Sequence, residues 1–243
     1  MKQSIFTILS NTPLTDCVYK MVLSGDTSAI TAPGQFINIQ ITGKFLRRPI
    51  SVCDYDGDTL TIVYKVVGKG TEILSRMVPE EKLDILTGLG NGYDLAPAGN
   101  SPVLLGGGVG VPPLYHLAKR LLAMGKQVTV ILGFNTQSEV FYEAEFRALG
   151  CRVIVATADG SYGVKGFATT PLNDLNYSYF YTCGPEPMLK AVYADCKTSG
   201  QFSFEERMGC GFGACMGCSC ETKYGNKRIC KDGPVLEKEE IVW

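Results

Sequence analysis

The spacing of apolar residues changes near residue 98, and this change divides the chain into two kinds of predicted structure. Before that point, apolar side chains alternate with other residues over 36–41 and 60–66, as in half-buried strands. Turn sequences such as Asp56-Gly-Asp58 separate the apolar runs. One helical interruption is expected near 70–77. Residues 1–98 are therefore predicted to form a small closed antiparallel β-barrel.

Beyond residue 98, short apolar strands alternate with helical patterns. The first helix has one leucine-rich face and is expected to end at Gly125. Thr136 and Glu139 have the spacing of a capping box, which would begin a second helix that ends near Gly150. Strands that alternate with helices predict a doubly wound parallel sheet, here over 99–203. The expected strands cover 103–105, 128–132, 152–156 and 178–182.

Composition and charge exclude several classes of protein. The 243 residues are 45% hydrophobic and 19% charged, with a formal net charge of −1, as in a packed globular protein. The sequence has no run of lysine and arginine that would bind nucleic acid, and no apolar run long enough to cross a bilayer. The first residues lack the apolar core and cleavage site of a signal peptide. We therefore expect a cytoplasmic protein that binds neither nucleic acid nor membranes.

Half of the ten cysteines lie in the stretch from Cys210 to Cys230. Cys210, Cys215 and Cys218 follow the pattern C-x4-C-x2-C with further cysteines downstream, which is the plant-type spacing of a [2Fe–2S] cluster. Cys220 lies so close to Cys218 that the two thiolates would crowd one side of a cluster, whereas Cys230 can return from a separate strand. The predicted metal ligands are Cys210, Cys215, Cys218 and Cys230, in a small C-terminal module over 204–243.

Glycines at 209, 211, 213 and 217 give this loop the freedom to fold around a cluster, because residues without Cβ tolerate positive φ and close approach. Two alternatives remain for the cysteines. Zinc usually takes paired C-x2-C knuckles, of which Cys215 and Cys218 form only one. Disulfides need an oxidising compartment, which nothing in the sequence indicates. The spacing favours iron–sulfur over both.

Further stretches carry groups that suit a phosphate-bearing ligand. Arg48 and Ser51 follow a strand, where a guanidinium can pair with two phosphate oxygens, and the glycine-rich loop at 68–71 opens a helix. For both stretches an ordinary solvated strand edge is the simpler interpretation. The glycine turn at 106–110 joins a strand to a helix, so its free amides can face an anion, although such a turn can equally serve packing alone. Cys183 stands at the carboxyl end of a strand, where such sheets bind ligands.

Several motifs taken together are typical of one family. They are Arg48-Pro-Ile-Ser51, Gly70-Thr71, Gly106-Gly-Gly-Val-Gly-Val-Pro-Pro-Leu114, Asp159-Gly-Ser-Tyr-Gly163, Cys183-Gly-Pro-Glu-Pro-Met188, Glu206-Arg-Met-Gly-Cys210 and Asp232-Gly-Pro-Val235. On these residues the chain resembles the electron-transfer subunits of dihydroorotate dehydrogenase B, within the wider ferredoxin-reductase superfamily. The resemblance spans nearly the whole chain. The C-terminal cysteine module is its most specific feature, because general reductases lack it.

The resemblance implies an FAD in the N-terminal barrel, an NAD on the α/β domain and a [2Fe–2S] cluster in the C-terminal module. The residues implied for FAD are Arg48, Pro49, Ile50, Ser51, Val63, Tyr64, Lys65, Gly70 and Thr71. The residues implied for NAD are Gly106, Gly107, Gly108 and Gly110, with Cys183, Gly184 and Pro185 near the nicotinamide. The implied partner is an FMN-containing catalytic subunit that oxidises dihydroorotate to orotate in pyrimidine (UMP) biosynthesis, in a heterotetramer of two plus two.

These cofactors would form a relay. Nicotinamide exchanges a two-electron hydride, a cluster carries one electron at a time, and a flavin does both, so FAD has to stand between them. No side chain is needed as a nucleophile, and no catalytic residue is predicted. NAD rather than NADP is expected, because no arginine follows the strand at 128–132. Two alternatives stay open: the reductase subunit of a ferredoxin-dependent NADP oxidoreductase or sulfur reductase, and a non-catalytic zinc-binding adaptor.

Three side chains outside these motifs carry expectations. The only histidine, His116, lies on the helix after the glycine turn and is expected to be a surface or structural residue rather than a ligand or base. Phe212 and Met216 stand between the predicted cluster ligands. We expect them to form an exposed apolar patch for the partner subunit, although packing beneath the loop is an equal alternative.

Overall fold

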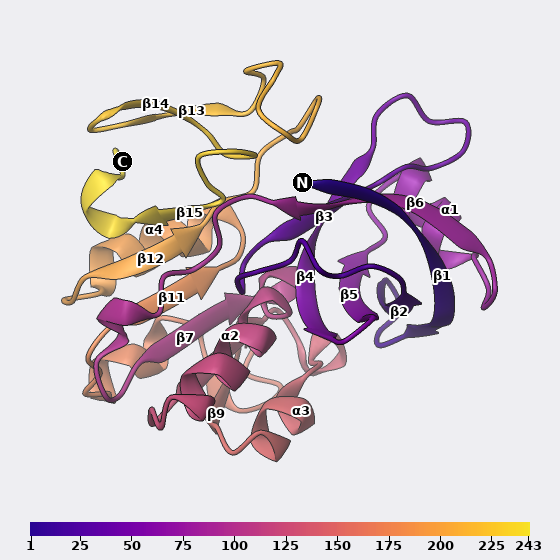
Figure 1. The fold of residues 1–243 in the computed structure, drawn as a ribbon. Coiled ribbons are helices and arrows are strands. Elements are labelled where there is room, and N and C mark those ends of the chain that lie inside the picture. The colour runs from indigo at the N-terminus through magenta and orange to yellow at the C-terminus, as the bar shows by residue number, and fades with distance from the viewer.

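The protein is described over residues 1–243 by a computed structural model, and its N-terminal part is a closed β-barrel (Figure 1). Six strands close in the order β1-β2-β5-β4-β3-β6, and every neighbouring pair is antiparallel. The strands are β1 (Lys2–Pro13), β2 (Val18–Ser24), β3 (Phe36–Ile39), β4 (Arg48–Asp56), β5 (Thr59–Lys65) and β6 (Lys82–Leu89). One short helix, α1 (Lys69–Ser75), lies between β5 and β6. The predicted barrel and its single helical interruption are confirmed.

The interior of the barrel accounts for the alternating pattern in the sequence. Ile37 and Ile39 on β3, with Ile62 and Tyr64 on β5, are at most 1% exposed and belong to the barrel core of 15 buried residues. Because successive side chains of a strand point to opposite faces, the residues between them face outward. Val63 accordingly packs in a different core, which the barrel shares with the second part of the chain.

The second part is a seven-stranded sheet with the order β10-β9-β8-β7-β11-β12-β15. All neighbours in it are parallel except β12 and β15. Its strands are β7 (Val103–Gly107), β8 (Thr129–Phe134), β9 (Arg152–Thr157), β10 (Val164–Lys165), β11 (Phe180–Cys183), β12 (Gly200–Ser203) and β15 (Val235–Glu237). The helices are α2 (Pro113–Ala123), α3 (Glu143–Ala148) and α4 (Glu186–Asp195), with 3-10 turns η1 (Ala96–Ala98), η2 (Gly108–Gly110), η3 (Gln137–Glu139), η4 (Thr170–Asp174) and η5 (Lys238–Glu240). The predicted parallel sheet is confirmed. No helix in the chain has both the length and the apolar character needed to cross a bilayer.

The second predicted helix begins later than its capping box indicates, so that prediction is wrong. Thr136 makes no side-chain capping bond, only η3 follows it, and α3 begins at Glu143. The carboxylate of Glu139 instead accepts hydrogen bonds from the backbone N–H of Asn135, at 3.1 Å, and from its side-chain amide, at 2.9 Å. Because Asn135 occupies this carboxylate, it is not free to close a capping box with Thr136.

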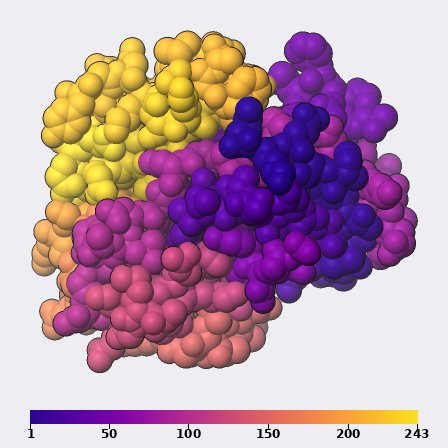
Figure 2. Space-filling model, in the orientation of Figure 1, coloured from indigo at the N-terminus to yellow at the C-terminus, as the bar shows by residue number.

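The C-terminal segment is built into both other parts of the chain (Figure 2). It forms a hairpin of β13 (Ser219–Thr222) and β14 (Gly225–Arg228), and then β15 joins the sheet antiparallel to β12. Asn91, just after the barrel, holds β15 through two hydrogen bonds to Val235. Its Nδ2 donates to the carbonyl of Val235 at 2.7 Å, and its Oδ1 accepts the N–H of Val235 at 3.1 Å. Residue 204 remains the predicted start of a separate module, although the last strand of this module lies in the sheet of residues 99–203.

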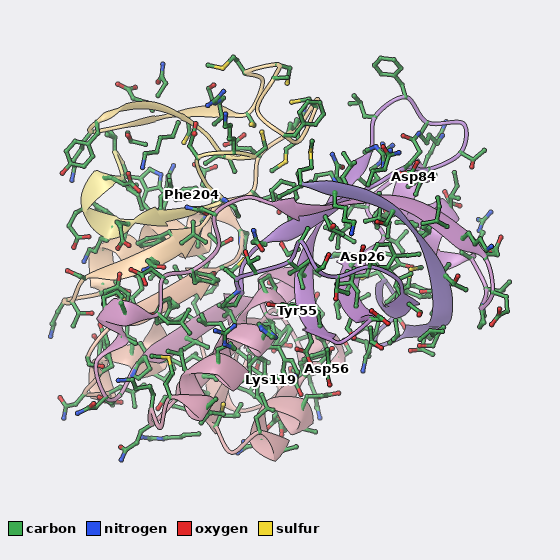
Figure 3. The ribbon with its side chains drawn as sticks, viewed as in Figure 1. Asp26, Tyr55, Asp56, Asp84, Lys119 and Phe204 are labelled. Atoms are coloured by element: carbon green, nitrogen blue, oxygen red, sulfur yellow. The ribbon has the colours of Figure 1, made fainter.

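One polar cluster joins the barrel to helix α2, and Figure 3 labels two of its members, Tyr55 of β4 and Lys119 of α2. Asp54 of β4 accepts Lys119 Nζ at 2.7 Å and lies 2.8 Å from Nδ1 of His116, whose ring stacks on Tyr55 with centroids 4.5 Å apart. Burial opposes the charge of Asp54, but the bonds from His116 and Lys119 outweigh it, and the pKa of this carboxyl is lowered. His116 is therefore a buried structural residue with a partner.

Candidate functional site

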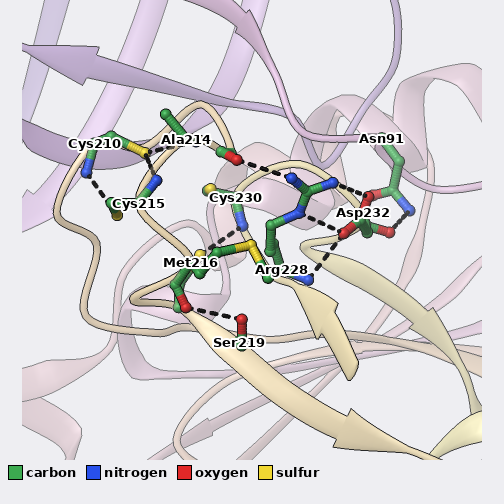
Figure 4. Close-up of polar contacts among 11 residues, drawn as sticks. Asn91, Cys210, Ala214, Cys215, Met216, Ser219, Arg228, Cys230 and Asp232 are labelled. Carbon is green, nitrogen blue, oxygen red and sulfur yellow. Dashed lines mark hydrogen bonds and ion pairs between the residues drawn. The ribbon is translucent and has the colours of Figure 1, made fainter. Parts of the chain in front are cut away.

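The four cysteines predicted as metal ligands are arranged in two pairs, and Figure 4 labels Cys210, Cys215 and Cys230 among them. The Sγ atom of Cys210 accepts the backbone N–H groups of Ala214, at 3.2 Å, and Cys215, at 3.4 Å, and the N–H of Cys210 points back at Cys215 Sγ, at 3.4 Å. In the second pair, the N–H of Cys230 lies 3.4 Å from Cys218 Sγ. Nowhere do three His, Cys, Asp or Glu side chains converge as they would around a single ion. Two thiol pairs fit the two irons of a [2Fe–2S] cluster better than they fit one zinc.

The backbone of the cluster loop, residues 210–218, depends on two of its glycines. Gly211 and Gly213 adopt φ of +78° and +91°, in the left-handed region, and a Cβ on Gly211 would lie 2.3 Å from Nδ2 of Asn38. Gly209 and Gly217 have no positive φ, and instead leave room beside Cys215 Sγ, which a Cβ would approach to 3.2 and 3.5 Å. The predicted positive φ is therefore confirmed at Gly211 and Gly213, and the predicted close approach accounts for Gly209.

The electrostatics of the loop differ between the two pairs. Burial disfavours the thiolate of Cys210, but N–H groups from Phe212, Cys215 and Ala214 outweigh it and lower the pKa of this thiol to about 6. Burial, with Cys218 beside it, raises the pKa of Cys230 to about 12. The loop itself thus prepares Cys210 to carry negative charge, whereas Cys230 would ionise only beside a cation.

A residue that the motifs did not single out, Arg228, ties the loop to the turn that carries Cys230. Its guanidinium donates to the carbonyl of Gly213 at 2.8 Å and to the carboxylate of Asp232 at 3.0 and 3.3 Å (Figure 4). The pKa of Asp232 is lowered as a result. Cys220 lies on β13 and belongs to neither sulfur pair. The only feature of the sequence that indicated this contact was the Asp232-Gly-Pro motif, which contains the partner of Arg228.

The barrel brings together three of the residues implied for FAD. Arg48 lies against the start of α1, where a Cβ on Gly70 would come within 2.4 Å of its Nε, and the hydroxyl of Thr71 is bonded to the loop that precedes the helix. Arg47 forms an ion pair with Asp84 at 2.9 Å, whereas the guanidinium of Arg48 donates only to the carbonyl of Leu46 and pairs with no carboxylate. The charge of Arg48 is therefore free for an anion, and this cradle fits a diphosphate.

The other residues implied for FAD differ in their exposure. Pro49, Ile50 and Ser51 are partly exposed along β4, and Lys65 is exposed at the end of β5. Val63 and Tyr64 are buried, at 4% and 1% exposure. The ring of Tyr64 fills the barrel and its hydroxyl donates to Asn11 at 3.0 Å, so this side chain cannot reach a ligand on the barrel surface.

The glycine turn and the Cys183 turn meet at the carboxyl edge of the sheet. Strands β7 and β11 are parallel neighbours, with Gly106 opposite Cys183. A Cβ on Gly110 would lie 2.2 Å from the carbonyl oxygen of Cys183, and one on Gly107 would lie 2.4 Å from Met188 Sδ. Gly184 and Pro185 line the same junction. A Cβ on Gly110 would lie 2.6 Å from the backbone nitrogen of Gly184, and one on Gly107 would lie 3.1 Å from Pro185.

Gly108 differs from the other glycines of this turn. Its φ is +51°, and no atom lies within 4 Å of where its Cβ would stand, so its backbone borders open space. The helices α2 and α4 follow the adjacent strands β7 and β11, and the crevice at such a switch of strand order is where open α/β sheets bind nucleotides. Close packing therefore explains Gly106, Gly107 and Gly110, the positive φ explains Gly108, and the open space beside Gly108 leaves room for a ligand.

Two carboxylates occupy the same edge of the sheet, beyond β8 and β9. Glu139 is held by Asn135 as described above, and Asp159 accepts the backbone N–H of Ser161 at 2.9 Å and its hydroxyl at 2.7 Å, which lowers the pKa of Asp159. Lys165 is the cation of this loop, and its side-chain carbons lie over Gly160. From the sequence we predicted only that no arginine follows β8, and we did not predict the two carboxylates at this edge.

Family models match two parts of the chain. Residues 205–242 match the iron–sulfur cluster binding domain of dihydroorotate dehydrogenase B, and residues 104–194 match the oxidoreductase NAD-binding domain. The electron transfer subunit of dihydroorotate dehydrogenase B (NAD(+)) from Bacillus pumilus is 43% identical, over 99% of this chain and 98% of the relative. The subunit from Geobacillus thermodenitrificans is 44% identical, over 97% of each chain.

The chain belongs to this family of electron transfer subunits. Among solved structures, an NADH-dependent reduced ferredoxin-NADP oxidoreductase matches at a TM-score of 0.89 and 28% identity, over 98% of this chain and 90% of that one. A ferredoxin NADP+ reductase from Neisseria gonorrhoeae with bound FAD and NADP matches at a TM-score of 0.70 and 20% identity, over 80% and 90%, which shows the fold alone. Membership of the family explains why one chain combines a barrel, a nucleotide sheet and a cysteine loop.

The fourth ligand can be tested by replacing the two competing cysteines. Cys230→Ser is expected to lower iron from about two per chain to near zero and to remove the visible bands of the cluster, while flavin stays bound. The reason is that Cys230 is paired with Cys218, whereas Cys220 has no place in either pair. Metal, sulfide and flavin analyses of the purified variant provide the measurement.

Cys220→Ser is the matched control and is expected to keep full iron and sulfide. Loss of the cluster in Cys220→Ser, with a normal cluster in Cys230→Ser, would reverse the assignment.

Proposed function

We propose that this chain carries electrons from a partner catalytic subunit, which oxidises dihydroorotate to orotate, to NAD+. The observation that supports this most directly is the cysteine loop, with its two thiol pairs, joined to a reductase barrel and sheet in a chain of this family. Oxidation of dihydroorotate releases two electrons and two protons. Both electrons and one proton end on NAD+, and the other proton goes to solvent. This is a step of pyrimidine biosynthesis.

FAD bound to the barrel would supply the conversion between paired and single electrons. Arg48 would hold its diphosphate, with Gly70 and Thr71 beside it. Pro49, Ile50 and Ser51 would border the rest of the molecule along β4. The buried residues Val63 and Tyr64 would contribute backbone only, and Lys65 its exposed side chain.

NAD would lie over the glycine turn 106–110, with its nicotinamide at Cys183-Gly184-Pro185. Amide groups of the turn would face the pyrophosphate there, as helix and turn amides do in open α/β sheets, and the missing Cβ of Gly108 would leave room for it. Glu139 and Asp159 would accept hydrogen bonds from ribose hydroxyls and repel a 2′-phosphate. Preference for NAD over NADP follows from these charges.

Cys210, Cys215, Cys218 and Cys230 would hold the [2Fe–2S] cluster. N–H groups directed at Cys210 Sγ stabilise negative charge on the sulfur, and they would raise the potential of a cluster bound there. Cys215 is exposed, so a cluster on this loop would lie at the surface. A surface position suits exchange of electrons with another protein.

The partner surface is proposed at Phe212 and Met216, which are 44% and 56% exposed on the cluster loop. Their predicted exposure is confirmed, and their role as an interface stays a prediction. We place two copies of this chain with two FMN-containing subunits, as the family resemblance implies. None of the ten cysteines forms a disulfide, and a cytoplasmic location is part of this proposal.

A second candidate function is electron transfer to NADP in a ferredoxin-dependent oxidoreductase. The solved NADH-dependent reduced ferredoxin-NADP oxidoreductase supports it, because its chain covers 98% of this one at 28% identity. The two functions differ in electron donor and in the pyridine nucleotide they use.

The proposed function is tested in the complex reconstituted with the FMN-containing catalytic subunit. Dihydroorotate is expected to reduce NAD+ about tenfold or more faster than NADP+, a difference of about 1.4 kcal/mol. Glu139→Gln should narrow this ratio, because it removes one charge that opposes the 2′-phosphate. Anaerobic formation of NADH and NADPH, followed by the absorbance of the reduced nicotinamide, gives both rates.

Asp195→Asn removes an exposed carboxylate at the far end of α4 and should leave the ratio unchanged. No dihydroorotate-dependent reduction, or equal rates with the two nucleotides, would contradict the proposal.

The proposed partner surface at Phe212 and Met216 predicts that a change there weakens assembly with the catalytic subunit. Phe212→Asp is expected to weaken association with the catalytic subunit by about tenfold or more, since it places a charge in an apolar interface. Its iron content and visible spectrum should match those of the unmodified chain. Titration of one subunit against the other by calorimetry gives the affinity.

Tyr224→Asp is the matched control, because Tyr224 is a 78% exposed aromatic residue in the turn between β13 and β14, outside the cluster loop. Equal affinities of the Phe212 and Tyr224 variants for the catalytic subunit would exclude Phe212 and Met216 as the partner surface.

A further inference from the structure

One buried side chain of the barrel touches the cluster loop directly. Asn38 lies on β3 between Ile37 and Ile39, which fill the barrel, so its side chain points outward. It is 1% exposed, and its Nδ2 donates a hydrogen bond to the backbone carbonyl of Cys210 at 3.2 Å. A predicted cluster ligand is thereby connected to the wall of the predicted flavin domain.

The fit around this amide leaves little freedom. Gly211 follows Cys210 and lies so close that a Cβ would stand 2.3 Å from Asn38 Nδ2. The loop backbone therefore rests directly on the amide, and any larger residue at either position would displace it.

The backbone of Asn38 is fixed as well. Arg47 donates to its carbonyl oxygen at 3.2 Å and to the carbonyl of Asp84 at 3.1 Å, and pairs with the Asp84 carboxylate. Across the ladder, Asn38 stands opposite Pro49, within the stretch proposed to border the flavin. A displacement of β4 would therefore be transmitted to the cluster loop through Asn38, which pairs with β4 and bonds Cys210.

The other end of the amide has no partner. Oδ1 of Asn38 is buried and accepts no hydrogen bond. An unpaired buried acceptor is costly, and a site that keeps one is completed by a donor that arrives with a ligand or an ordered water. Asn38 lies where β3 meets the cluster loop, between the proposed flavin site and the proposed cluster, and such a donor would have to arrive at this boundary.

We infer that Asn38 is a positioning residue that fixes the cluster loop against the flavin strand and thereby sets the potential of the cluster. This inference rests on the proposed function. With Cys210 held through its carbonyl, the N–H groups of Ala214 and Cys215 stay aimed at Cys210 Sγ, where they stabilise the extra negative charge of the reduced cluster. Loss of the tie lets these groups turn away, and the cluster becomes harder to reduce.

The test is a redox titration of the full chain, followed by electron paramagnetic resonance. Asn38→Ala is expected to bind the normal amounts of flavin, iron and sulfide, but its cluster potential should move to more negative values. A smaller fraction of cluster should then be reduced at a given excess of NADH. Asn38→Asp keeps the shape, removes the donor and adds a negative charge, so its shift should be larger in the same direction.

Asn91→Ala is the matched control. Asn91 also ties the C-terminal segment to the barrel side of the chain, but its side chain bonds Val235 of β15 and the carbonyl of Asp232, at 3.4 Å, and makes no bond to the cluster loop 210–218. Its loss should lower thermal stability and leave the cluster potential unchanged.

An unchanged potential in both Asn38 variants, or an equal shift in Asn91→Ala, would overturn the role of Asn38. If Asn38→Ala does not retain its cluster, Asn38→Ser, with its smaller polar side chain, is measured in its place under the same criteria. An unmodified chain without flavin or iron would contradict the proposed function itself, and so the two failures are distinguishable.

Discussion

The fixed position of the cluster loop against the barrel is the constraint on which the rest of the structure depends. A one-electron centre in this chain has to lie near a flavin on one side and near another protein on the other. The chain meets both conditions by anchoring its C-terminal segment at separate places, through Asn38 at Cys210 and through Asn91 at Val235. The pairing of β15 with β12 adds a third anchor. A hydrophobic core shared by all three parts of the chain, including Cys218 and Cys230, makes the arrangement rigid.

Close backbone approach is the second physical theme, and it recurs at each proposed cofactor site. Gly70 admits the guanidinium of Arg48, Gly110 admits the carbonyl of Cys183, and Gly211 admits the amide of Asn38. In each case a Cβ would stand 2.4 Å or less from its neighbour. Backbone groups and a few charges therefore form the sites, which suits a protein whose work is placement and tuning of cofactors rather than nucleophilic catalysis.

The sequence predicted the features that depend on local pattern and missed those that depend on distant partners. The alternation around Ile62 predicted the barrel because the period of two is visible within one strand. The partner of His116 is Asp54, which is 62 positions away, and no local pattern indicates it. The three-residue strand β15 is too short to show a period. At Glu139 the local motif was misleading, because Asn135 competes for the same carboxylate.

The most direct test of the account is an anaerobic titration of the purified chain with NADH, followed by absorption and electron paramagnetic resonance. The account predicts that flavin and iron–sulfur bands bleach together, and that the signal of one reduced [2Fe–2S] cluster appears for each flavin. Reduction of flavin alone, with zinc rather than iron bound at the cysteines, would contradict it. The chain would then be a simple reductase with a structural metal site.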